Sequence, residues 1–323
     1  YLFVQRFRPR FAQIAKFKFT TSRDVTRAMS AAEDATSSQA PPVVAKVLMK
    51  HFGATPLNFE DRLLADWWTT LFDAMYLKTD GDVVEDAAIT QAECAILEAE
   101  LGLVAGMHVL DLCCGQGRHA LELASQVPGL FVSGIDQSEF LITLARERTR
   151  SSLSNRVSFS VGDCRNLVYK DDSFDAVLVM GNSFGYFDSA DQDDVVLAEV
   201  RRVLKPGGRL LIDVTDGDHM RASFNERSWE IIGDSLFVVR GRHISRDNTR
   251  LISREVVSHF DQGIVRDQVY AERLYTARDM EKLLAANGFV DIMRAGEFLT
   301  GAMSQRPGMQ DLGMMQKRII MVA

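Results

Sequence analysis

A glycine turn after a short apolar run is the first stretch of the chain whose residue types could do chemistry. Residues 111–119, DLCCGQGRH, place Gly115 and Gly117 around a glutamine, with two cysteines just before them. Because glycine lacks a Cβ, such a turn lets the backbone approach a ligand closely, which is typical of nucleotide sites. The third glycine of GxGxxG is replaced by Ala120, and the chain contains no GKS or GKT, which excludes an ATP-hydrolysing P-loop.

Two carboxylates follow the next apolar runs at the same relative place. Asp136 ends the run 130–136, and Asp163 ends the run 157–163. In open α/β sheets a ligand binds at the carboxyl ends of the strands. We therefore expect both side chains at the same sheet edge as the glycine turn.

The adjacent cysteines invite a redox or metal interpretation that their spacing does not support. Cys113 and Cys114, with Cys94 and Cys164, form no CxxC motif, and neighbours in sequence rarely form a disulfide. At the end of a strand the two side chains point to opposite faces. We interpret the thiols as reduced and mostly buried in a non-secretory compartment, and we predict no metal site.

Strand-like and helix-like stretches alternate along the middle of the chain. The strand-like runs are 107–113, 130–136, 157–163, 174–181 and 209–215, and the helix-like stretches are 117–126, 138–151 and 192–204. Ser138 is a suitable N-cap for the second helix. This repeated order predicts an α/β domain with a mostly parallel sheet.

Other patterns flank this core. Apolar residues at helical spacing predict two helices joined by a TDGD loop: 59–77 and 87–103. Three further runs predict an antiparallel insertion over the ligand edge: 235–245, 249–260 and 263–274. A last helix and two late strands complete the pattern: 276–289, 289–298 and 317–323.

The first 42 residues differ in composition from the rest. Residues 1–30 contain seven basic side chains and one acid, although the whole chain has a net charge of −7. This basic, acid-poor composition is typical of an organelle transit peptide, with a mitochondrial address favoured over a plastid one, and residues 30–42 read as a flexible linker. A plain basic tail would instead leave the protein cytoplasmic. The acidic remainder disfavours a nucleic-acid partner, and no apolar run approaches the length of a membrane span.

Six stretches, in their order and spacing, resemble the class I S-adenosylmethionine-dependent methyltransferases. They are VLDLCCGQGRH, GIDQS, VGDCRNL, FDAVLVMGNSFGYF, VRRVLKPGGRLLIDV and LLAANGF, and the surroundings of the fourth resemble the small-molecule subgroup of methyltransferase domains 25 and 11. The resemblance implies a Rossmann-like fold, with a seven-stranded mostly parallel sheet whose last strand is antiparallel, and S-adenosyl-L-methionine as cofactor.

With the element pattern, the resemblance divides the chain into five regions. These are the transit peptide and linker (1–42), a helical cap (43–106), the cofactor-binding core (107–215), a β-rich lid insertion (216–275) and the C-terminal part of the core sheet (276–323).

The resemblance also assigns cofactor contacts by position. Asp111 is the family position that reaches the methionine amino group, Asp136 would accept from both ribose hydroxyls, and Asp163 would accept from the adenine amino group. The remaining contacts that it implies lie beside these positions: Gly115, Gly117, Arg118, Gln137, Cys164, Gly181 and Asn182. Arg118 has two interpretations, a structural role at the helix start or a bidentate bond to the cofactor carboxylate.

Methyl transfer is an in-line displacement, so the protein has to orient the acceptor and, for a hydroxyl, remove its proton. Tyr186, after the fourth strand, is the first catalytic candidate, and His219, after the fifth, is the second. Each is also compatible with a plain wall or loop position. Tyr76 and the acidic residues 80–82 of the front segment are further candidates.

These patterns predict an enzyme that methylates O or N of a small-molecule acceptor, with the insertion as lid and as a homodimer contact. Two alternatives stay open: an organellar protein or RNA methyltransferase, and a non-catalytic assembly factor on the same fold. GNSFGY stands where an NPPY-like tetrapeptide would favour an amide or nucleobase amine. The intact glycine and acidic positions disfavour the non-catalytic alternative.

Overall fold

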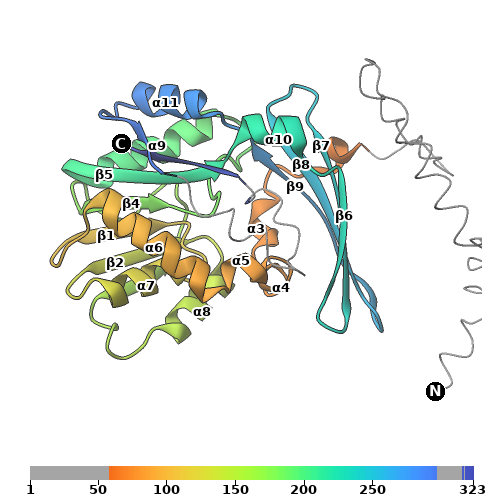
Figure 1. Cartoon of the computed structure of the whole chain (residues 1–323), viewed down its shortest axis with the longest axis horizontal. Coiled ribbons are helices and arrows are strands. Elements are labelled where there is room, and N and C mark those ends of the chain that lie inside the picture. The colour runs from red at the N-terminus through yellow and green to blue at the C-terminus, as the bar shows by residue number, and fades with distance from the viewer. Residues whose placement is uncertain (1–57, 297–314, 316) are drawn as a thin grey trace, which may run out of the picture. The chain divides into compact units, whose positions relative to one another are not determined.

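The computed structural model describes residues 58–296, 315 and 317–323. They form a seven-stranded sheet of order β10-β11-β5-β4-β1-β2-β3 and a four-stranded sheet of order β6-β7-β8-β9. Figure 1 shows the short helices of the front segment between the two sheets. The predicted transit peptide and linker, with residues 43–57 of the predicted cap, lie outside the described residues.

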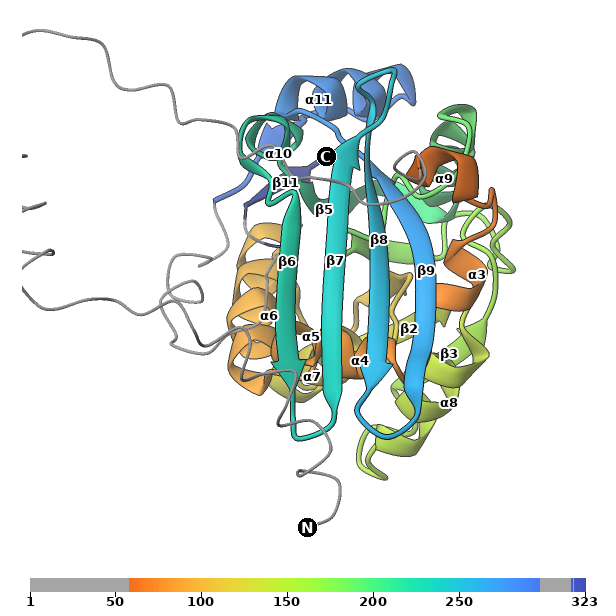
Figure 2. The ribbon, with the colours of Figure 1, turned by 90° about the vertical axis from the view of Figure 1, so that its right-hand side faces the viewer.

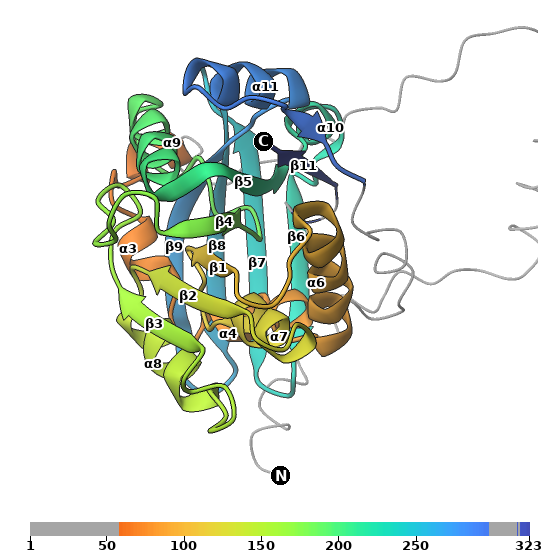
Figure 3. The same ribbon diagram turned by 90° about the vertical axis from the view of Figure 1, so that its left-hand side faces the viewer.

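The larger sheet is parallel from β3 to β5 and antiparallel at its other end. Its strands are β1 (His108–Leu112), β2 (Phe131–Asp136), β3 (Val157–Val161), β4 (Phe174–Val179), β5 (Leu204–Thr215), β10 (Met293–Arg294) and β11 (Arg318–Val322). β1 pairs in parallel with β2 and β4, whereas β11 runs antiparallel to β5 and β10. The predicted sheet is therefore confirmed, and Figure 3 shows it in front of the smaller one.

Helices cover both faces of the larger sheet because its central strands are apolar on both sides. They are α6 (Ala87–Leu101), α7 (Arg118–Gln126), α8 (Glu139–Arg148), α9 (Asp191–Val203) and α11 (Ala277–Ala286). The first three contribute to one buried cluster, with Leu123 at its centre, and the last two to another, with Leu197. Ser138 caps α8 by accepting the Leu141 N–H at 3.2 Å, as predicted.

The smaller sheet is an antiparallel insertion that follows β5, and we call it the lid. Its strands are β6 (Arg227–Ile232), β7 (Leu236–Ile244), β8 (Arg250–His259) and β9 (Gly263–Arg273). Phe59 and Leu63 pack on one of its faces, against Ile252, Val269 and Ala271. Figure 2 shows the lid face-on, with the helices of the core behind it.

The predicted continuous helix over 59–77 is wrong. The segment forms a 3-10 turn, η1 (Phe59–Arg62), and two short helices, α3 (Trp68–Leu71) and α4 (Tyr76–Thr79), and α5 (Gly81–Val84) then begins inside the predicted TDGD loop. The Asp73 carboxylate accepts the N–H groups of Met75 and Tyr76 at 2.8 and 3.1 Å. This cap starts a new turn and so interrupts a longer helix.

The insertion contains one strand and one helix more than the sequence predicts, β6 and α10 (Gly217–Ser223). β6 is an edge strand in which Trp229 and Ile231 are 70% and 58% exposed. Because these apolar residues are not buried, the sequence of β6 does not show the apolar and polar alternation that identifies a half-buried strand. The homodimer contact through the insertion stays a prediction. No helix among the described residues has the length and apolar character needed to cross a bilayer.

Candidate active site

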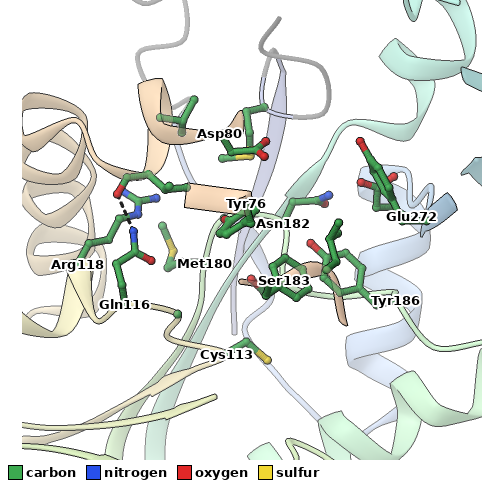
Figure 4. Close-up of a pocket in the computed structure, with 18 of the residues that line it drawn as sticks. Tyr76, Asp80, Cys113, Gln116, Arg118, Met180, Asn182, Ser183, Tyr186 and Glu272 are labelled. Carbon is green, nitrogen blue, oxygen red and sulfur yellow. Dashed lines mark hydrogen bonds between the residues drawn. The ribbon is translucent and has the colours of Figure 1, made fainter. Parts of the chain in front are cut away.

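Two adjoining pockets open at the carboxyl ends of the parallel strands. The first, which we call the lid pocket, lies between these ends and the lid, and the second, the strand pocket, lies beside the ends of β2 and β3. Both linings include Phe72, Tyr76, Cys113, Gly115, Ser183 and Tyr186. In Figure 4, Arg118 and Gln116 lie on one side of the lid pocket and Tyr186 and Glu272 on the other.

The Asp136 carboxylate organises the glycine turn at the strand pocket. Its Oδ2 accepts the Gly115 N–H and its Oδ1 accepts the Ser138 N–H, both at 2.8 Å. Burial raises the pKa of Asp136, and these N–H groups oppose that effect. The Gln137 N–H also favours the charged form. A carboxylate has about four acceptor positions, so the place of Asp136 is still compatible with the predicted contact to ribose hydroxyls.

The other residues predicted to contact adenosine also line the strand pocket, and their side chains already have partners. Arg165 donates to Asp163, with Nη2 2.6 Å from Oδ2, and this bond lowers the pKa of Asp163. Gln137 donates to the Trp68 carbonyl at 2.7 Å. Cys164 lines the pocket beside them. These contacts fix the loops before any ligand binds.

Gly117 is required by close packing as well as by backbone conformation. Its φ is +75°, and a Cβ there would lie 2.5 Å from the Phe159 Cζ. Gly115 has φ +54° with no close neighbour. Gly115 lines both pockets and has the narrow backbone profile that a closely approaching ligand needs, whereas Gly117 lines neither pocket and is required by its packing against Phe159.

Gly181 and Asn182 form a second turn, after β4, with φ values of +68° and +60°. The Gly181 N–H donates to Asp213 at 3.0 Å, and the Asn182 Oδ1 accepts the Thr215 N–H at 2.9 Å. Both residues line the lid pocket. Their bonds to β5 hold this turn at the predicted methyl end of the cofactor.

Asp111 lies behind the glycine turn and lines neither pocket. It is 1% exposed, and its Oδ2 has no hydrogen-bond partner among the described residues. Burial raises its pKa to about 7, although the Arg118 guanidinium and the Ala120 N–H favour the charged form. An unpartnered buried carboxyl oxygen fits a site completed by a cationic amino group.

Replacing Asp111 by Asn is expected to stabilise the ligand-free chain near pH 8. Because the folded-state pKa of Asp111 is raised from 3.8, the wild-type free energy of unfolding falls as the pH rises from about 4 to about 7. An amide does not ionise, so the free energy of unfolding of the variant does not fall in this way. The loss that it avoids is at most roughly 4 kcal/mol. Urea unfolding at pH 5, 6, 7 and 8 measures it, and a variant that is less stable at every pH contradicts the prediction.

Arg118 belongs to a buried ion network that the sequence does not reveal. Glu93 of α6 accepts hydrogen bonds from Arg118, from His119 at 2.9 Å and from Arg318 at 2.5 Å. Arg318 also donates to Asp213 at 2.6 Å. Burial and the Arg118 charge lower the pKa of His119 to about 4, so this imidazole is neutral at pH 7. Arg118 lines the lid pocket, but its structural role is established by Glu93.

Tyr186 lies where the two pockets meet. Its ring stacks on Phe72 with centroids 5.9 Å apart and lies 5.1 Å from Trp67. The lid positions its loop, because Arg273 and Arg250 donate to the adjoining Phe187 carbonyl at 3.1 and 2.6 Å. Burial raises the pKa of Tyr186 well above its ordinary value, which makes the phenol a hydrogen-bond donor and not a base at neutral pH.

The structure does not bring the other predicted catalytic residue to the site. His219 lies on α10 and is absent from the linings of both pockets. Its ring nitrogens lie 3.3 Å from the Ser223 Oγ, one turn along the same helix. The Asp216 side chain caps this helix, which keeps His219 on the helix surface. The position of His219 on α10 therefore does not support the predicted catalytic role.

A family model described as a methyltransferase domain matches residues 103–263, which include the glycine turn, Asp136, Asp163 and most of the lid. The chain belongs to the class I S-adenosylmethionine-dependent methyltransferases. This confirms the predicted family and, with it, S-adenosyl-L-methionine as the cofactor.

The curated relatives match the core of this chain. Methyltransferase GfsG of Streptomyces halstedii is 42% identical over 117 residues, which are 36% of this chain and 40% of that protein. A demethylmenaquinone methyltransferase of Lactiplantibacillus plantarum is 38% identical over 116 residues, 35% of this chain and 47% of that protein. The match thus spans less than half the length of these two relatives.

Solved structures confirm the predicted fold of the methyltransferase. The CcbJ methyltransferase of Streptomyces caelestis has a TM-score of 0.58 at 18% identity and covers 76% of this chain and 96% of its own. An S-adenosylmethionine-dependent methyltransferase of Clostridium acetobutylicum has a TM-score of 0.57 at 19% identity and covers 77% and 95%. At these identities the likeness concerns the fold alone.

Sequence reasoning missed the polar lining that the lid contributes. Arg240, Arg242, Glu255, Tyr270 and Glu272 come from β7, β8 and β9 and line the lid pocket. Strand alternation was the available signal, since residues two apart share a face. It does not say which face is turned toward the core.

Proposed function

We propose that the chain transfers a methyl group from S-adenosylmethionine to an oxygen or nitrogen atom of a small polar acceptor. The observation that carries the proposal is the junction of the two pockets at Phe72, Tyr76 and Tyr186. One pocket has the carboxylates suited to adenosine, and the other is closed by the polar face of the lid. Donor and acceptor molecules bound in them would meet at the aromatic junction.

The residues present fit the cofactor. Gly115 lines both pockets and has no Cβ to narrow them, and Asp136 lines the strand pocket with oxygens that can accept ribose hydroxyls. Asp111 lies behind the turn, and its unpartnered oxygen would suit an amino group that reached it. When bound, S-adenosylmethionine would supply a methyl group attached to a sulfonium sulfur, and this sulfur becomes a neutral thioether when the methyl group is transferred. The Phe72 and Tyr186 rings exclude water from the junction, and the phenol of Tyr186 orients an acceptor by donating a hydrogen bond.

The position of the lid supports a small acceptor over a macromolecular one. Tyr270 and Glu272 of β9 face the glycine turn across the pocket, and Trp67 of the front segment fills the space beside them, with its ring 5.9 Å from that of Tyr270. A protein or RNA chain would have to displace this segment. A quinone acceptor, which the name of one relative suggests, would be a different outcome of the experiment below.

A transfer assay tests the proposal. The full chain is incubated with methyl-labelled S-adenosylmethionine and cell extract divided into small-molecule and macromolecular fractions, with Asp136→Asn as control. We expect label in the small-molecule fraction, on O or N by mass spectrometry of the product, and none with the variant. Label on carbon or only on macromolecules overturns the acceptor class. If no fraction is labelled and the chain does not bind S-adenosylhomocysteine, the proposal that it is a methyl-transferring enzyme is overturned.

A further inference from the structure

Glu272 is a buried carboxyl that lines the lid pocket and forms no ion pair with another residue in the part of the chain that the structure describes. It lies in β9 opposite Leu251 of β8, is 6% exposed, and lines the pocket. Its Oε2 has no hydrogen-bond partner among the described residues. A carboxyl held in this way is stabilised by a ligand that brings a donor or a positive charge.

The cations of the lid are directed to other partners. Arg240 donates to Glu255 at 2.8 Å and also bonds Glu230, while Arg242 donates to the Asn225 carbonyl at 3.2 Å. No ion pair within 4.0 Å joins either of them to Glu272 in the described part of the chain. The charge of Arg242 still favours the ionised form of Glu272, so the carboxyl is available to a ligand that brings a donor or a cation.

Asp80 presents a second carboxyl to the same pocket. It lies between α4 and α5, and its Oδ2 accepts the Thr79 hydroxyl at 2.9 Å. Burial raises its pKa, and Arg240 opposes that effect. The two carboxyls disfavour each other's charge, since Asp80 is among the groups that raise the pKa of Glu272. One cation between them would relieve this repulsion.

Aromatic rings form the rest of the pocket wall. Tyr76, Phe72, Tyr186, Trp67 and Tyr270 are linked in that order by ring contacts with centroids 5.1 to 5.9 Å apart. The faces of such rings attract alkylammonium groups. Carboxyls beside aromatic walls are a suitable environment for an organic cation and a poorer one for a neutral hydroxyl compound.

We propose that the acceptor is an amine, which enters the lid pocket as an ammonium ion, and that Glu272 binds it and takes its proton. This inference rests on the proposed function and names its acceptor class. The ionised Glu272 carboxylate removes one proton from R–NH3+ and leaves R–NH2. The nitrogen lone pair then forms the N–C bond while the S–C bond breaks and its electron pair stays on sulfur. The product is R–NH2+–CH3, and the proton on Glu272 leaves to solvent.

The ionisation of Glu272 on binding a cation predicts a measurable release of protons. Burial raises its pKa to about 8, with Arg242 opposing and Asp80 reinforcing that effect, so the empty pocket holds a mainly protonated carboxyl at pH 7. Tyr186 and Tyr270, which also face it, have raised pKa values and stay protonated. An ammonium ion that pairs with the carboxylate must therefore expel close to one proton to solvent.

Calorimetry on the full chain saturated with S-adenosylhomocysteine tests the inference at pH 7. Cyclohexylammonium and the smaller methylammonium are the cationic probes, and cyclohexanol is the neutral isostere. Titrations in buffers of different ionisation enthalpy count the protons released. We expect at least one cation to bind at least 10-fold more tightly than cyclohexanol with close to one proton released, and Glu272→Gln to lose both the affinity difference and the release. Glu281→Gln, an exposed change on α11, is expected to behave as wild type.

The proposed function and the amine inference fail separately in this experiment. If S-adenosylhomocysteine does not bind the wild-type chain, the proposed function fails. If it binds but neither cation does, or cyclohexanol binds as tightly, or Glu272→Gln still releases the proton, only the amine inference is overturned. Unchanged binding of S-adenosylhomocysteine by Glu272→Gln shows that this variant is folded.

Discussion

Replacing Asp136 by Asn is expected to weaken the binding of S-adenosylhomocysteine by at least 100-fold. In the proposed role each carboxylate oxygen accepts one ribose hydroxyl in addition to the N–H of Gly115 or Ser138. Hydrogen bonds to a charged group contribute about 1.5–3 kcal/mol each, so losing the charge and one acceptor costs more than 100-fold. Asp136 is 8% exposed, so water has little opportunity to replace the lost hydrogen bonds. Isothermal titration calorimetry measures the dissociation constant.

Two comparisons separate ribose recognition from general damage. Asp175→Asn changes a carboxylate that binds the His108 N–H and Lys205 at the opposite end of the sheet, and it should leave binding unchanged. Wild type should prefer adenosine to 2′-deoxyadenosine, and Asp136→Asn should lose that preference, which is a coupling that misfolding alone does not produce. A loss below threefold, or a preserved preference, shows that Asp136 does not bind the ribose.

The parallel core could be read from the sequence because its constraints are local and repeated. β4 carries apolar residues on both faces and is buried along most of its length, which only a sheet covered on both sides permits. The glycine turn and Asp136 follow strand ends, and parallel strands deliver all their carboxyl ends to one edge. The positions of the pocket residues in this half therefore follow from chain order alone.

Apolar spacing predicted the wrong structure for the front segment because its apolar residues pack against different surfaces. Trp67 contacts Tyr186 at the junction of the pockets, whereas Trp68 packs edge-on against Phe187 with centroids 5.3 Å apart. Such contacts give apolar residues at helical spacing without a helix. The chain becomes extended at Leu63, before α3, and the Asp73 cap starts a new turn before α4. An isolated Asp is too common in sequences to predict such a break.

The face of the lid that lines the pocket could not be predicted from the sequence for a related reason. In β9 the alternating residues are Val269 and Ala271 on one face and Tyr270 and Glu272 on the other. The usual rule turns the apolar pair toward the core and the glutamate toward water. Here Phe59 and Leu63 cover the apolar face from outside, and the polar face closes the pocket. Sequence alternation identified the strand but not the side on which a ligand would lie.

Replacing Glu93 by Gln is expected to lower the free energy of unfolding by about 3–5 kcal/mol, because it leaves buried guanidinium charges without their counter-ion. The side chain of Glu93 is 3% exposed and those of Arg118 and Arg318 are 10% and 2% exposed. Although burial acts to raise it, Arg118 and His119 hold the pKa of Glu93 well below its usual range. Its contribution is therefore complete above pH 4.5 and is lost as the pH falls through the lowered folded-state pKa.

Urea unfolding at pH 7 measures the loss, and two variants show its origin. Asp171→Asn removes a 73% exposed partner of Arg202 and should cost less than about 1 kcal/mol. Arg318 keeps Asp213, whereas the hydrogen bond that Arg118 keeps among the described residues is the one to the Thr90 hydroxyl at 3.2 Å, so the charge left without an ion pair is chiefly that of Arg118. Adding Arg118→Gln to Glu93→Gln should then recover part of the stability. A double variant less stable than Glu93→Gln alone would place the cost in lost packing, and Arg118 would no longer be the charge that Glu93 compensates.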